Sequence, residues 1–172
     1  MDLKAKVRVV ADFPKEGISF KDVTTLLEDG PAYAQAIDQM IAAASEWEYD
    51  VIVGPEARGF LVGAPMAVKT GKGFVPIRKP GKLPYKTLSY EYDLEYGTDT
   101  LQIHEGSIKP GQRVLIADDL LATGGTVGAV KAMIEQMGGI VTGAVFLMEL
   151  MFLPGREKLG DTPIASIIQY ED

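Results

Sequence analysis

Short runs of apolar, mostly β-branched residues alternate along the chain with stretches whose apolar positions recur every three or four residues. The runs at 50–54, 74–77, 113–117, 140–147 and 164–168 predict buried strands. The patterns at 32–47, 59–69 and 125–137 predict helices. Continuous apolar strands that alternate with helices are typical of a mostly parallel sheet flanked by helices. The pattern therefore predicts an α/β fold in a single domain over 1–172.

Residues 82–104 depart from this alternation, because they are rich in Tyr, Thr and charged side chains. Their apolar positions alternate on either side of Gly97, which predicts two antiparallel strands around a turn. A long excursion from a compact sheet is commonly a lid. We therefore expect a flexible antiparallel lid loop at about 82–104.

The charge balance excludes several function classes. With 17 Lys and Arg against 24 Asp and Glu, the formal net charge is −7, which disfavours nucleic acid as a partner. The chain has no cysteine, no apolar run long enough for a membrane span and no leader-like start, so we expect a cytoplasmic protein without a membrane partner. A basic island at 78–86 suits a compact polyanion, although a solvated loop is the commoner explanation of such a cluster.

The strongest candidate for chemistry is the segment from Val114 to Thr126. An apolar strand leads into the adjacent Asp118 and Asp119, and a loop of small residues then precedes a helix. Such a loop can point backbone N–H groups at a phosphate, and the helix N-terminus favours the same charge. Carboxylates beside a phosphate suit either a cation or the hydroxyls of a sugar, so the pair predicts a ribose phosphate. The alternative is an ordinary helix start with incidental aspartates.

A second strand–loop–helix junction contains Glu56, Ala57 and Arg58. The Arg58 guanidinium could form paired hydrogen bonds with a phosphate. Taken alone, Glu56 and Arg58 are more simply explained as an exposed surface pair. Two such junctions at the carboxyl ends of strands in one sheet favour two anion sites.

The segment 114–126 resembles the fingerprint of the type I phosphoribosyltransferases. The resemblance implies that fold, with a small hood formed by about 1–30 and 148–172. It implies a ribose 5-phosphate site at Asp118, Asp119, Ala122, Thr123, Gly124, Gly125 and Thr126. It also implies a pyrophosphate site at Glu56, Ala57, Arg58, Lys79, Lys82 and Tyr96, with a cis peptide between Glu56 and Ala57. This fingerprint does not select the base, and it also occurs in regulators without catalysis.

Three further segments, at 12–23, 89–97 and 148–159, resemble adenine phosphoribosyltransferases in particular. The resemblance implies transfer of the phosphoribosyl group from phosphoribosyl pyrophosphate to adenine, giving AMP and pyrophosphate. Mg²⁺ would be held mainly by the substrate, without a direct protein ligand, and the chain would form a homodimer. The implied catalytic residues are Glu95, as general acid or base, with Asp118, Asp119 and Arg58. The implied adenine site consists of Ile18, Ser19, Phe20, Lys21 and Leu150.

Some alternatives stay open at this point. Phe20 and Leu150 could simply pack in the core, and Glu95 could simply make the lid soluble. The lone His104 has no partner motif and receives no role. A phosphoribosyltransferase for another base, or a regulator that binds a phosphoribosyl ligand without catalysis, would show the same fingerprint.

Overall fold

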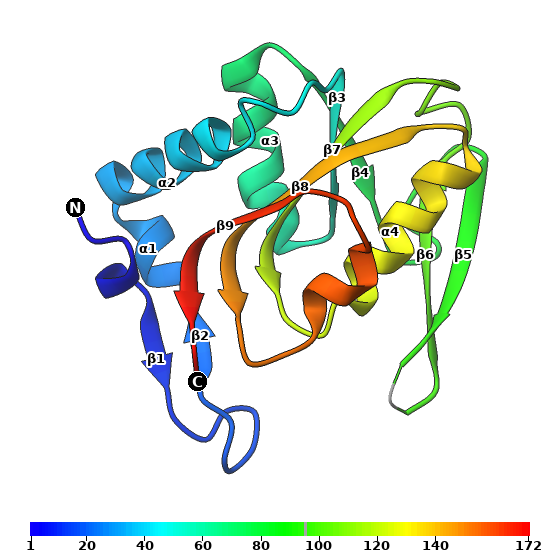
Figure 1. Cartoon of the computed structure of the whole chain (residues 1–172). Helices are drawn as coiled ribbons and strands as arrows, with labels where there is room; N and C mark the ends of the chain where they lie inside the picture. Colours follow the sequence, from blue (N-terminus) through cyan, green and yellow to red (C-terminus); the bar gives the residue numbers. More distant parts are fainter. Residues whose placement is uncertain (95) are drawn as a thin grey trace.

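The fold is built on a parallel sheet of five strands in the order β4-β3-β7-β8-β9, seen in a computed structural model that describes residues 1–94 and 96–172 (Figure 1). The register pairs β3 with both β4 and β7, and β8 with both β7 and β9. The strands are β3 (Val51–Pro55), β4 (Gly73–Ile77), β7 (Arg113–Leu121), β8 (Ile140–Leu150) and β9 (Ile164–Tyr170). All five predicted strands are confirmed as members of this sheet.

Helices cover both faces of the sheet, because successive apolar side chains of each strand point to opposite faces and both faces must be buried. Ile52, Leu115 and Val145 belong to a cluster on the face covered by α1 (Thr24–Glu28), α2 (Gly30–Ala43) and α3 (Arg58–Thr70). Val53 and Ile116 belong to the cluster on the opposite face, which packs against α4 (Gly125–Gln136). The predicted helices are confirmed, although α2 ends at Ala43 rather than near residue 47.

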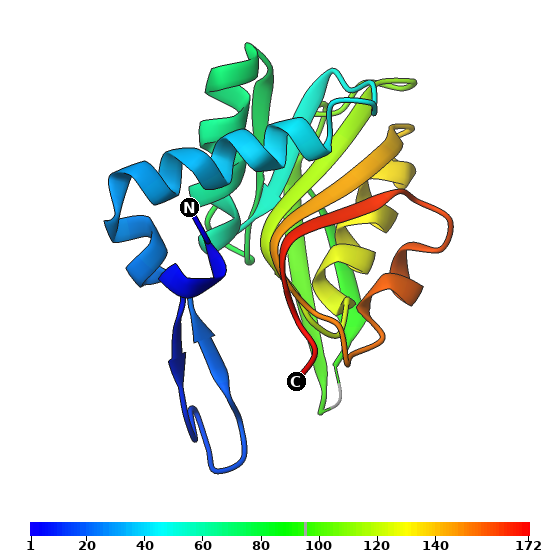
Figure 2. The same cartoon turned by 60° about the vertical axis from the view of Figure 1, so that its left-hand side comes forward.

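Two antiparallel hairpins extend the molecule beyond the carboxyl ends of the sheet strands (Figures 1 and 2). One is formed by β1 (Arg8–Val10) and β2 (Phe20–Asp22), next to the short 3₁₀ helix η1 (Lys4–Lys6). The other is formed by β5 (Thr87–Asp93) and β6 (Thr98–His104), in full register from Thr87 with His104 to Asp93 with Thr98. The second hairpin agrees with the antiparallel strands expected at 82–104, whereas the apolar pattern gave no sign of the first.

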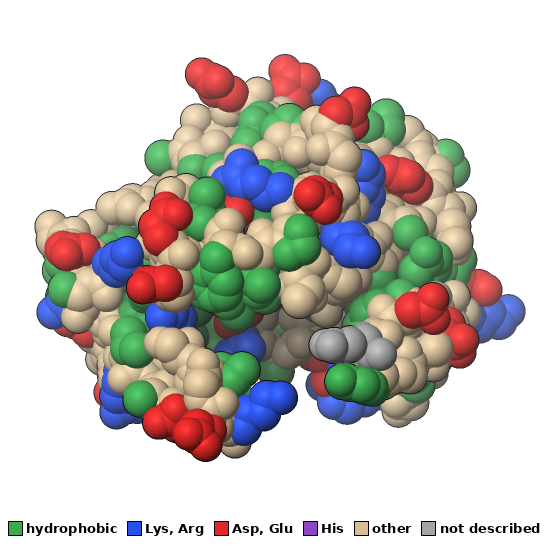
Figure 3. All heavy atoms as spheres, turned by 60° about the horizontal axis from the view of Figure 1, so that its bottom comes forward, with side chains coloured by type: hydrophobic (Ala, Val, Ile, Leu, Met, Phe, Trp, Pro, Cys, Tyr) green, Lys and Arg blue, Asp and Glu red, His purple; other side chains and the backbone are tan. Residues whose placement is uncertain are grey.

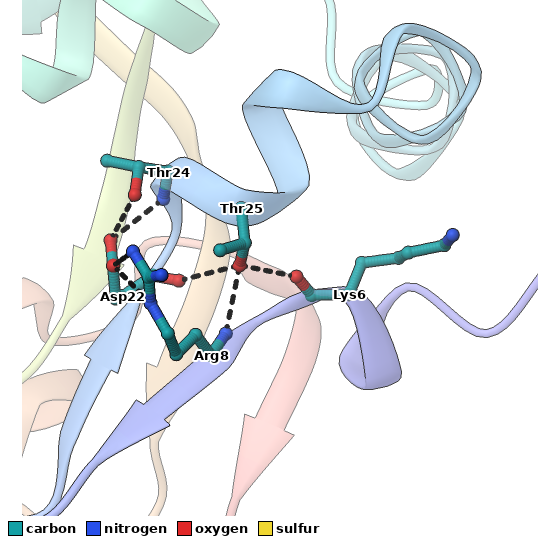
Figure 4. A network of polar contacts seen from close by, with 5 residues as sticks. All are labelled: Lys6, Arg8, Asp22, Thr24 and Thr25. Atoms are coloured by element: carbon teal, nitrogen blue, oxygen red, sulfur yellow. Dashed lines mark hydrogen bonds and ion pairs between the residues drawn. The ribbon is translucent and has the colours of Figure 1, made fainter.

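The N-terminal hairpin is attached to α1 by a polar network around Asp22 (Figure 4). One carboxylate oxygen of Asp22 accepts hydrogen bonds from the Thr24 hydroxyl at 2.6 Å and the Thr24 amide at 3.0 Å, while the other accepts from Arg8 Nε at 3.0 Å. The Thr25 hydroxyl donates to the carbonyl oxygen of Lys6 at 2.7 Å and accepts from the Arg8 amide at 3.1 Å. The network therefore joins both strands of the hairpin to the first turn of α1.

Tyr170, at the end of β9, ties the same hairpin to the edge of the sheet. The ammonium groups of Lys4 and Lys21 lie 4.8 and 4.7 Å from the centroid of its ring, a distance at which cations are attracted to aromatic faces. The Lys21 side chain is buried, and its Nζ also donates to the Ser19 hydroxyl at 2.9 Å. The buried charge is thus compensated by a ring and a hydroxyl.

In the described part of the chain, α-helices are too short or too polar to cross a lipid bilayer.

We expect the Asp22 network to stabilise the fold in a pH-dependent way. Hydrogen bonds from Thr24, followed by Arg8, lower the pKa of the Asp22 carboxyl from 3.8 to about 2. A carboxyl whose pKa is lower in the folded state stabilises that state above its unfolded pKa, and this contribution is lost as the pH falls through the folded value. The difference in free energy of unfolding between the wild type and Asp22→Asn should therefore shrink as the pH is lowered to about 2.

Urea unfolding of both proteins at a series of pH values measures this difference. Asp38→Asn is the matched control, because Asp38 pairs with Lys69 on an exposed surface and such pairs contribute little. A difference for Asp22→Asn that stays constant down to about pH 2 would contradict the prediction.

Candidate functional site

A cavity of about 330 Å³ lies at the carboxyl ends of β3 and β7, which are neighbours in the sheet. Figure 3 shows a hollow on this side of the molecule, between two protruding lobes. The walls come from the two predicted anion junctions together. They are formed by Pro55, Glu56, Ala57, Arg58, Gly59, Asp118, Asp119, Leu120, Leu121, Ala122, Thr123, Gly124, Gly125, Thr126 and Val127. The structure therefore brings together two segments that lie about sixty residues apart in the chain.

The carboxylates of Asp118 and Asp119 lie within β7, which continues to Leu121. The strand was expected to end at residue 117, so this boundary was wrong. It was wrong because β8 pairs with β7 as far as Leu121 with Glu149 and carries the ladder past the acidic pair. Tertiary pairing thus overrides the low strand preference of aspartate. As a result, the pair is held by a sheet rather than by a loop.

Asp119 keeps a free acceptor in the cavity wall. The residue is 6% exposed, and its Oδ2 atom is buried without a hydrogen-bond partner in the described structure. Arg58 Nε lies 3.0 Å from this oxygen, within ion-pair distance, but its N–H is not aligned for a hydrogen bond. Because an unmet buried acceptor is costly, the geometry suits a ligand hydroxyl or a cation at this position.

Asp118 sits in a less favourable environment for a negative charge. Burial, followed by repulsion from the Asp119 carboxylate, raises the pKa of Asp118 well above its usual range, while the Asp119 amide donates to Asp118 Oδ1 at 2.8 Å. The carboxyl also packs closely against the start of α3. A Cβ atom at Gly59 would lie only 2.9 Å from Asp118 Oδ1, so a side chain there would displace the carboxylate. Gly59 was not among the predicted site residues.

Two helix N-termini meet at the cavity. Neither α3 nor α4 has a side-chain hydrogen bond at its N-cap, so the first backbone N–H groups of both helices are available to a ligand. Thr123 and Thr126 are exposed beside the start of α4 and can add hydroxyl donors. The Glu56–Ala57 peptide before α3 is cis, as the family resemblance implied. Together these features are suited to anionic groups.

The basic island does not line the cavity, but it contacts one of its walls. Glu56 Oε1 accepts hydrogen bonds from the Lys79 amide at 2.7 Å and from Arg78 Nε at 3.2 Å, and Lys82 pairs with Glu56 Oε2. Lys79 forms its ion pair with Asp99 of β6. Sequence reasoning missed Asp99, because Lys79 and Asp99 meet only when the second hairpin packs beside β4.

The residues expected to bind the base lie outside the cavity walls. Phe20 contacts the ring of Phe13 with centroids 5.1 Å apart, and Leu150 is half-buried against the core at the end of β8. Ile18 and Ser19 are exposed on the N-terminal hairpin. Tyr96 is 88% exposed, and Glu95 lies outside the described residues.

Among the described residues, no group of three or more His, Cys, Asp or Glu side chains is arranged to hold a metal ion. A cation that arrives with an anionic ligand needs fewer protein atoms, because Mg²⁺ usually binds through phosphates and water. The unpartnered Asp119 Oδ2 and the ionisation cost at Asp118 are compatible with such a cation.

Comparison with known proteins agrees with this geometry. Residues 23–151 match the phosphoribosyl transferase domain family. An adenine phosphoribosyltransferase from Brevibacillus brevis is 59% identical over 170 residues, which cover 99% of this chain and 100% of that protein. The crystal structure of adenine phosphoribosyltransferase from Thermoanaerobacter pseudethanolicus has a TM-score of 0.95 at 53% identity, with 98% of both chains covered. The Saccharomyces cerevisiae enzyme, solved with an imino-altritol bisphosphate and adenine, has a TM-score of 0.89 at 38% identity over 96% of each chain.

The fold is the type I phosphoribosyltransferase fold. Its parallel sheet is flanked by helices, and the segments that follow two neighbouring strands line the cavity. This chain belongs to the phosphoribosyltransferase family. Within that family, the relatives compared above are adenine phosphoribosyltransferases.

We expect Gly124 and Gly125 to differ sharply in their tolerance of a side chain. Gly124 has a φ of +86°, and a Cβ atom there would lie 2.5 Å from the carbonyl oxygen of Gly155. At Gly125 the nearest atom would be 3.9 Å away. Gly124→Ala should lower the free energy of unfolding by roughly 1–3 kcal/mol. Gly125→Ala should change it by less than about 1 kcal/mol.

Denaturant unfolding of the two variants beside the wild type measures both values. Equal effects of the two substitutions would show that the packing of Gly124 against Gly155 does not define the loop.

Proposed function

We propose that this chain transfers the 5-phosphoribosyl group from phosphoribosyl pyrophosphate to adenine, forming AMP and pyrophosphate. The observation that carries the proposal is the single cavity that holds the acidic pair of β7 and both helix N-termini. Two carboxylates that can accept hydrogen bonds from hydroxyl groups lie between two helix N-termini that can bind anions. This arrangement matches a sugar that bears a phosphate at one end and a pyrophosphate at the other. The proposal is supported by relatives named for this activity over almost the full chain.

In this proposal, the ribose 5-phosphate occupies the loop from Ala122 to Thr126. The N–H groups at the start of α4 and the hydroxyls of Thr123 and Thr126 donate to the phosphate oxygens. Asp118 and Asp119 accept hydrogen bonds from the two ribose hydroxyls. Asp119 Oδ2 supports this assignment, because it lies at ion-pair distance from Arg58 but accepts no aligned hydrogen bond from the described residues.

The pyrophosphate lies on the other side of the cavity, at the start of α3. Arg58 is about half exposed and can turn from Asp119 toward a phosphate. Glu56 and Ala57 place the loop backbone at the wall, while Lys79, Lys82 and Tyr96 approach from the basic island and the second hairpin. The resemblance implies that the lysines of this segment sometimes act across a dimer interface, so the proposal includes a homodimer.

The reaction forms a bond from adenine N9 to the ribose C1 and breaks the bond from C1 to the pyrophosphate oxygen, which leaves with the electron pair. Positive charge develops on the sugar ring, as in other glycosyl transfers. The Asp118 and Asp119 carboxylates stabilise this charge, and the cationic side chains stabilise the leaving group. Glu95 accepts the proton that adenine loses. The chain supplies position and electrostatics, and no protein nucleophile is needed.

The base would lie under the N-terminal hairpin. Backbone groups near Ser19 and Lys21 would recognise the amino edge of adenine, with Phe20 and Leu150 on its two faces. Of the related structures, the Saccharomyces cerevisiae enzyme contains adenine and the Giardia lamblia enzyme 9-deazaadenine. The buried Lys21 side chain supports the assignment, because its contact with Tyr170 holds this hairpin against the sheet.

The proposal also includes Mg²⁺ and a cytoplasmic location. Mg²⁺ would bind mainly through the substrate phosphates, with Asp118 and Asp119 close by, and would neutralise charge on the leaving pyrophosphate.

Turnover with separate bases tests the proposal directly. Protein, Mg²⁺ and phosphoribosyl pyrophosphate are mixed with adenine, hypoxanthine, guanine or orotate, and nucleotide products are measured by chromatography. We expect AMP from adenine and little product from the other bases, because they lack the amino group at the recognised edge. Preference for another base would replace adenine in the assignment, and binding without turnover would indicate a regulator.

Asp119→Asn should reduce kcat/KM roughly ten- to hundredfold, because it removes a charged acceptor from the ribose hydroxyls. Asp118→Asn should act in the same direction. The control is Asp161→Asn, which removes an exposed charge from the loop before β9. Steady-state rates with unchanged thermal stability would separate an effect on chemistry from an effect on folding. Full activity in both site variants would refute the ribose assignment.

Glu95→Gln should lower kcat by roughly a hundredfold or more if this residue takes the proton from adenine. Glu91→Gln is a matched control, since Glu91 is an exposed glutamate on β5, four positions earlier in the chain. The pH dependence of kcat is the deciding measurement. If Glu95 is the proton acceptor, the decrease in kcat at low pH that comes from its protonation should be absent in Glu95→Gln. Unchanged turnover would reduce Glu95 to a solvating role.

A further inference from the structure

The three cations assigned to pyrophosphate each contact a carboxylate of the protein. Arg58 lies 3.0 Å from Asp119, Lys79 pairs with Asp99, and Lys82 pairs with Glu56. An acidic protein of formal charge −7 thus surrounds its basic groups with its own counter-ions. Any anion that binds these cations must compete with carboxylates already in place.

Glu56 differs from the other two carboxylates in the number of its contacts and in its position. Its side chain is 10% exposed and lines the cavity. It contacts Lys82 Nζ, Arg78 Nε at 3.2 Å and the Lys79 amide at 2.7 Å. One carboxylate therefore holds three donors of the basic island.

The Glu56 carboxyl is ionised at neutral pH. Burial alone would raise its pKa, but the hydrogen bonds from Lys82 and from the Lys79 amide outweigh burial and hold the pKa below its usual range. A fixed negative charge on the cavity wall repels a second anion over a few ångströms, and this repulsion is stronger in a partly buried site than in water.

We propose that Glu56 acts as an internal competitor of pyrophosphate. Its carboxylate pairs with Lys82 and Arg78 whenever pyrophosphate is not bound, and this competition lowers the affinity for the product. This inference rests on the proposed function, since it concerns the pyrophosphate side of the same cavity. When pyrophosphate binds, Lys82 leaves the Glu56 carboxylate and pairs with the pyrophosphate. When pyrophosphate leaves, Lys82 pairs with Glu56 again. Glu56 thereby favours product release, a step that limits the rate of many enzymes.

The alternative is that Glu56 acts only as a structural brace, which holds the basic island in the conformation that binds pyrophosphate. The two explanations predict opposite effects of removing the charge. Glu56→Gln keeps the size of the side chain and an oxygen that can accept from the Lys79 amide, but it no longer neutralises Lys82. Internal competition predicts tighter pyrophosphate binding in this variant, whereas a brace predicts weaker binding.

Calorimetric titration of inorganic pyrophosphate with Mg²⁺ into the wild type and Glu56→Gln measures the sign. We expect the Kd to fall roughly three- to tenfold, the range for loss of one partly exposed ion pair. The control is Glu48→Gln, which changes the net charge equally but removes an 83% exposed partner of Arg113. The control should leave the Kd within about twofold of the wild type, because exposed distant charges are screened.

A double-mutant cycle with Lys82→Met tests whether Lys82 carries the effect. If Glu56 competes through this lysine, Glu56→Gln should tighten binding less in the Lys82→Met background than in the wild type. If Glu56→Gln does not fold, Glu56→Ala is titrated instead, because it also removes the charge that pairs with Lys82. The same tightening is then expected.

An unchanged or higher Kd in the folded Glu56 variant overturns the inference. This result is distinct from failure of the proposed function, because the titration needs no turnover. A wild type that binds pyrophosphate but forms no AMP would refute the transferase assignment alone. A wild type that forms AMP, with a Glu56 variant that binds pyrophosphate no more tightly, would refute the competitor role alone.

Discussion

The parallel pairing of β3 with β7 is the constraint on which the site depends. The register of Val51 with Val114 and of Val53 with Ile116 sets the carboxyl end of β3 beside the part of β7 that carries Asp118 and Asp119, so the segments that follow the two strands face one cavity. The helices that begin after these loops then direct two N-termini to the same place. Together the two junctions line one cavity of about 330 Å³.

Close packing fixes the position of the acidic pair within this frame. β8 continues beside β7 past Asp118 and Asp119, which holds both carboxylates on a sheet rather than on a mobile loop. Gly59 lets the Asp118 carboxylate approach the start of α3, and Gly124 lets the loop before α4 approach Gly155. The cost of ionising Asp118 in this place is consistent with a ligand that brings positive charge or hydroxyl donors to it.

The two hairpins add what the sheet cannot supply. The N-terminal hairpin is held by the Asp22 network and by the contacts of Lys4 and Lys21 with Tyr170, while the second hairpin is linked to the basic island by Lys79 and Asp99. The second hairpin is also part of the core, because Leu101 and Ile103 of β6 are buried in the cluster that packs against α4. The N-terminal hairpin is joined to the rest of the fold by polar and cation–ring contacts. In the proposed reaction, hairpins that extend beyond the carboxyl ends of the strands suit a step from which water must be excluded.

The amino-acid sequence by itself determined the α/β class, the five strands of the sheet, the three long helices and the segments that form the cavity. The elements follow from the local periodicity of apolar residues. The cavity segments follow from the small residues and hydroxyl side chains that are typical of a loop before a helix that binds an anion. Only the tertiary structure decided that β7 runs through Asp118 and Asp119, that the N-terminal hairpin forms, and that Glu56 and Asp99 neutralise the basic island. These features depend on pairing between residues about ten or more positions apart, for which the pattern along one strand or helix carries no information.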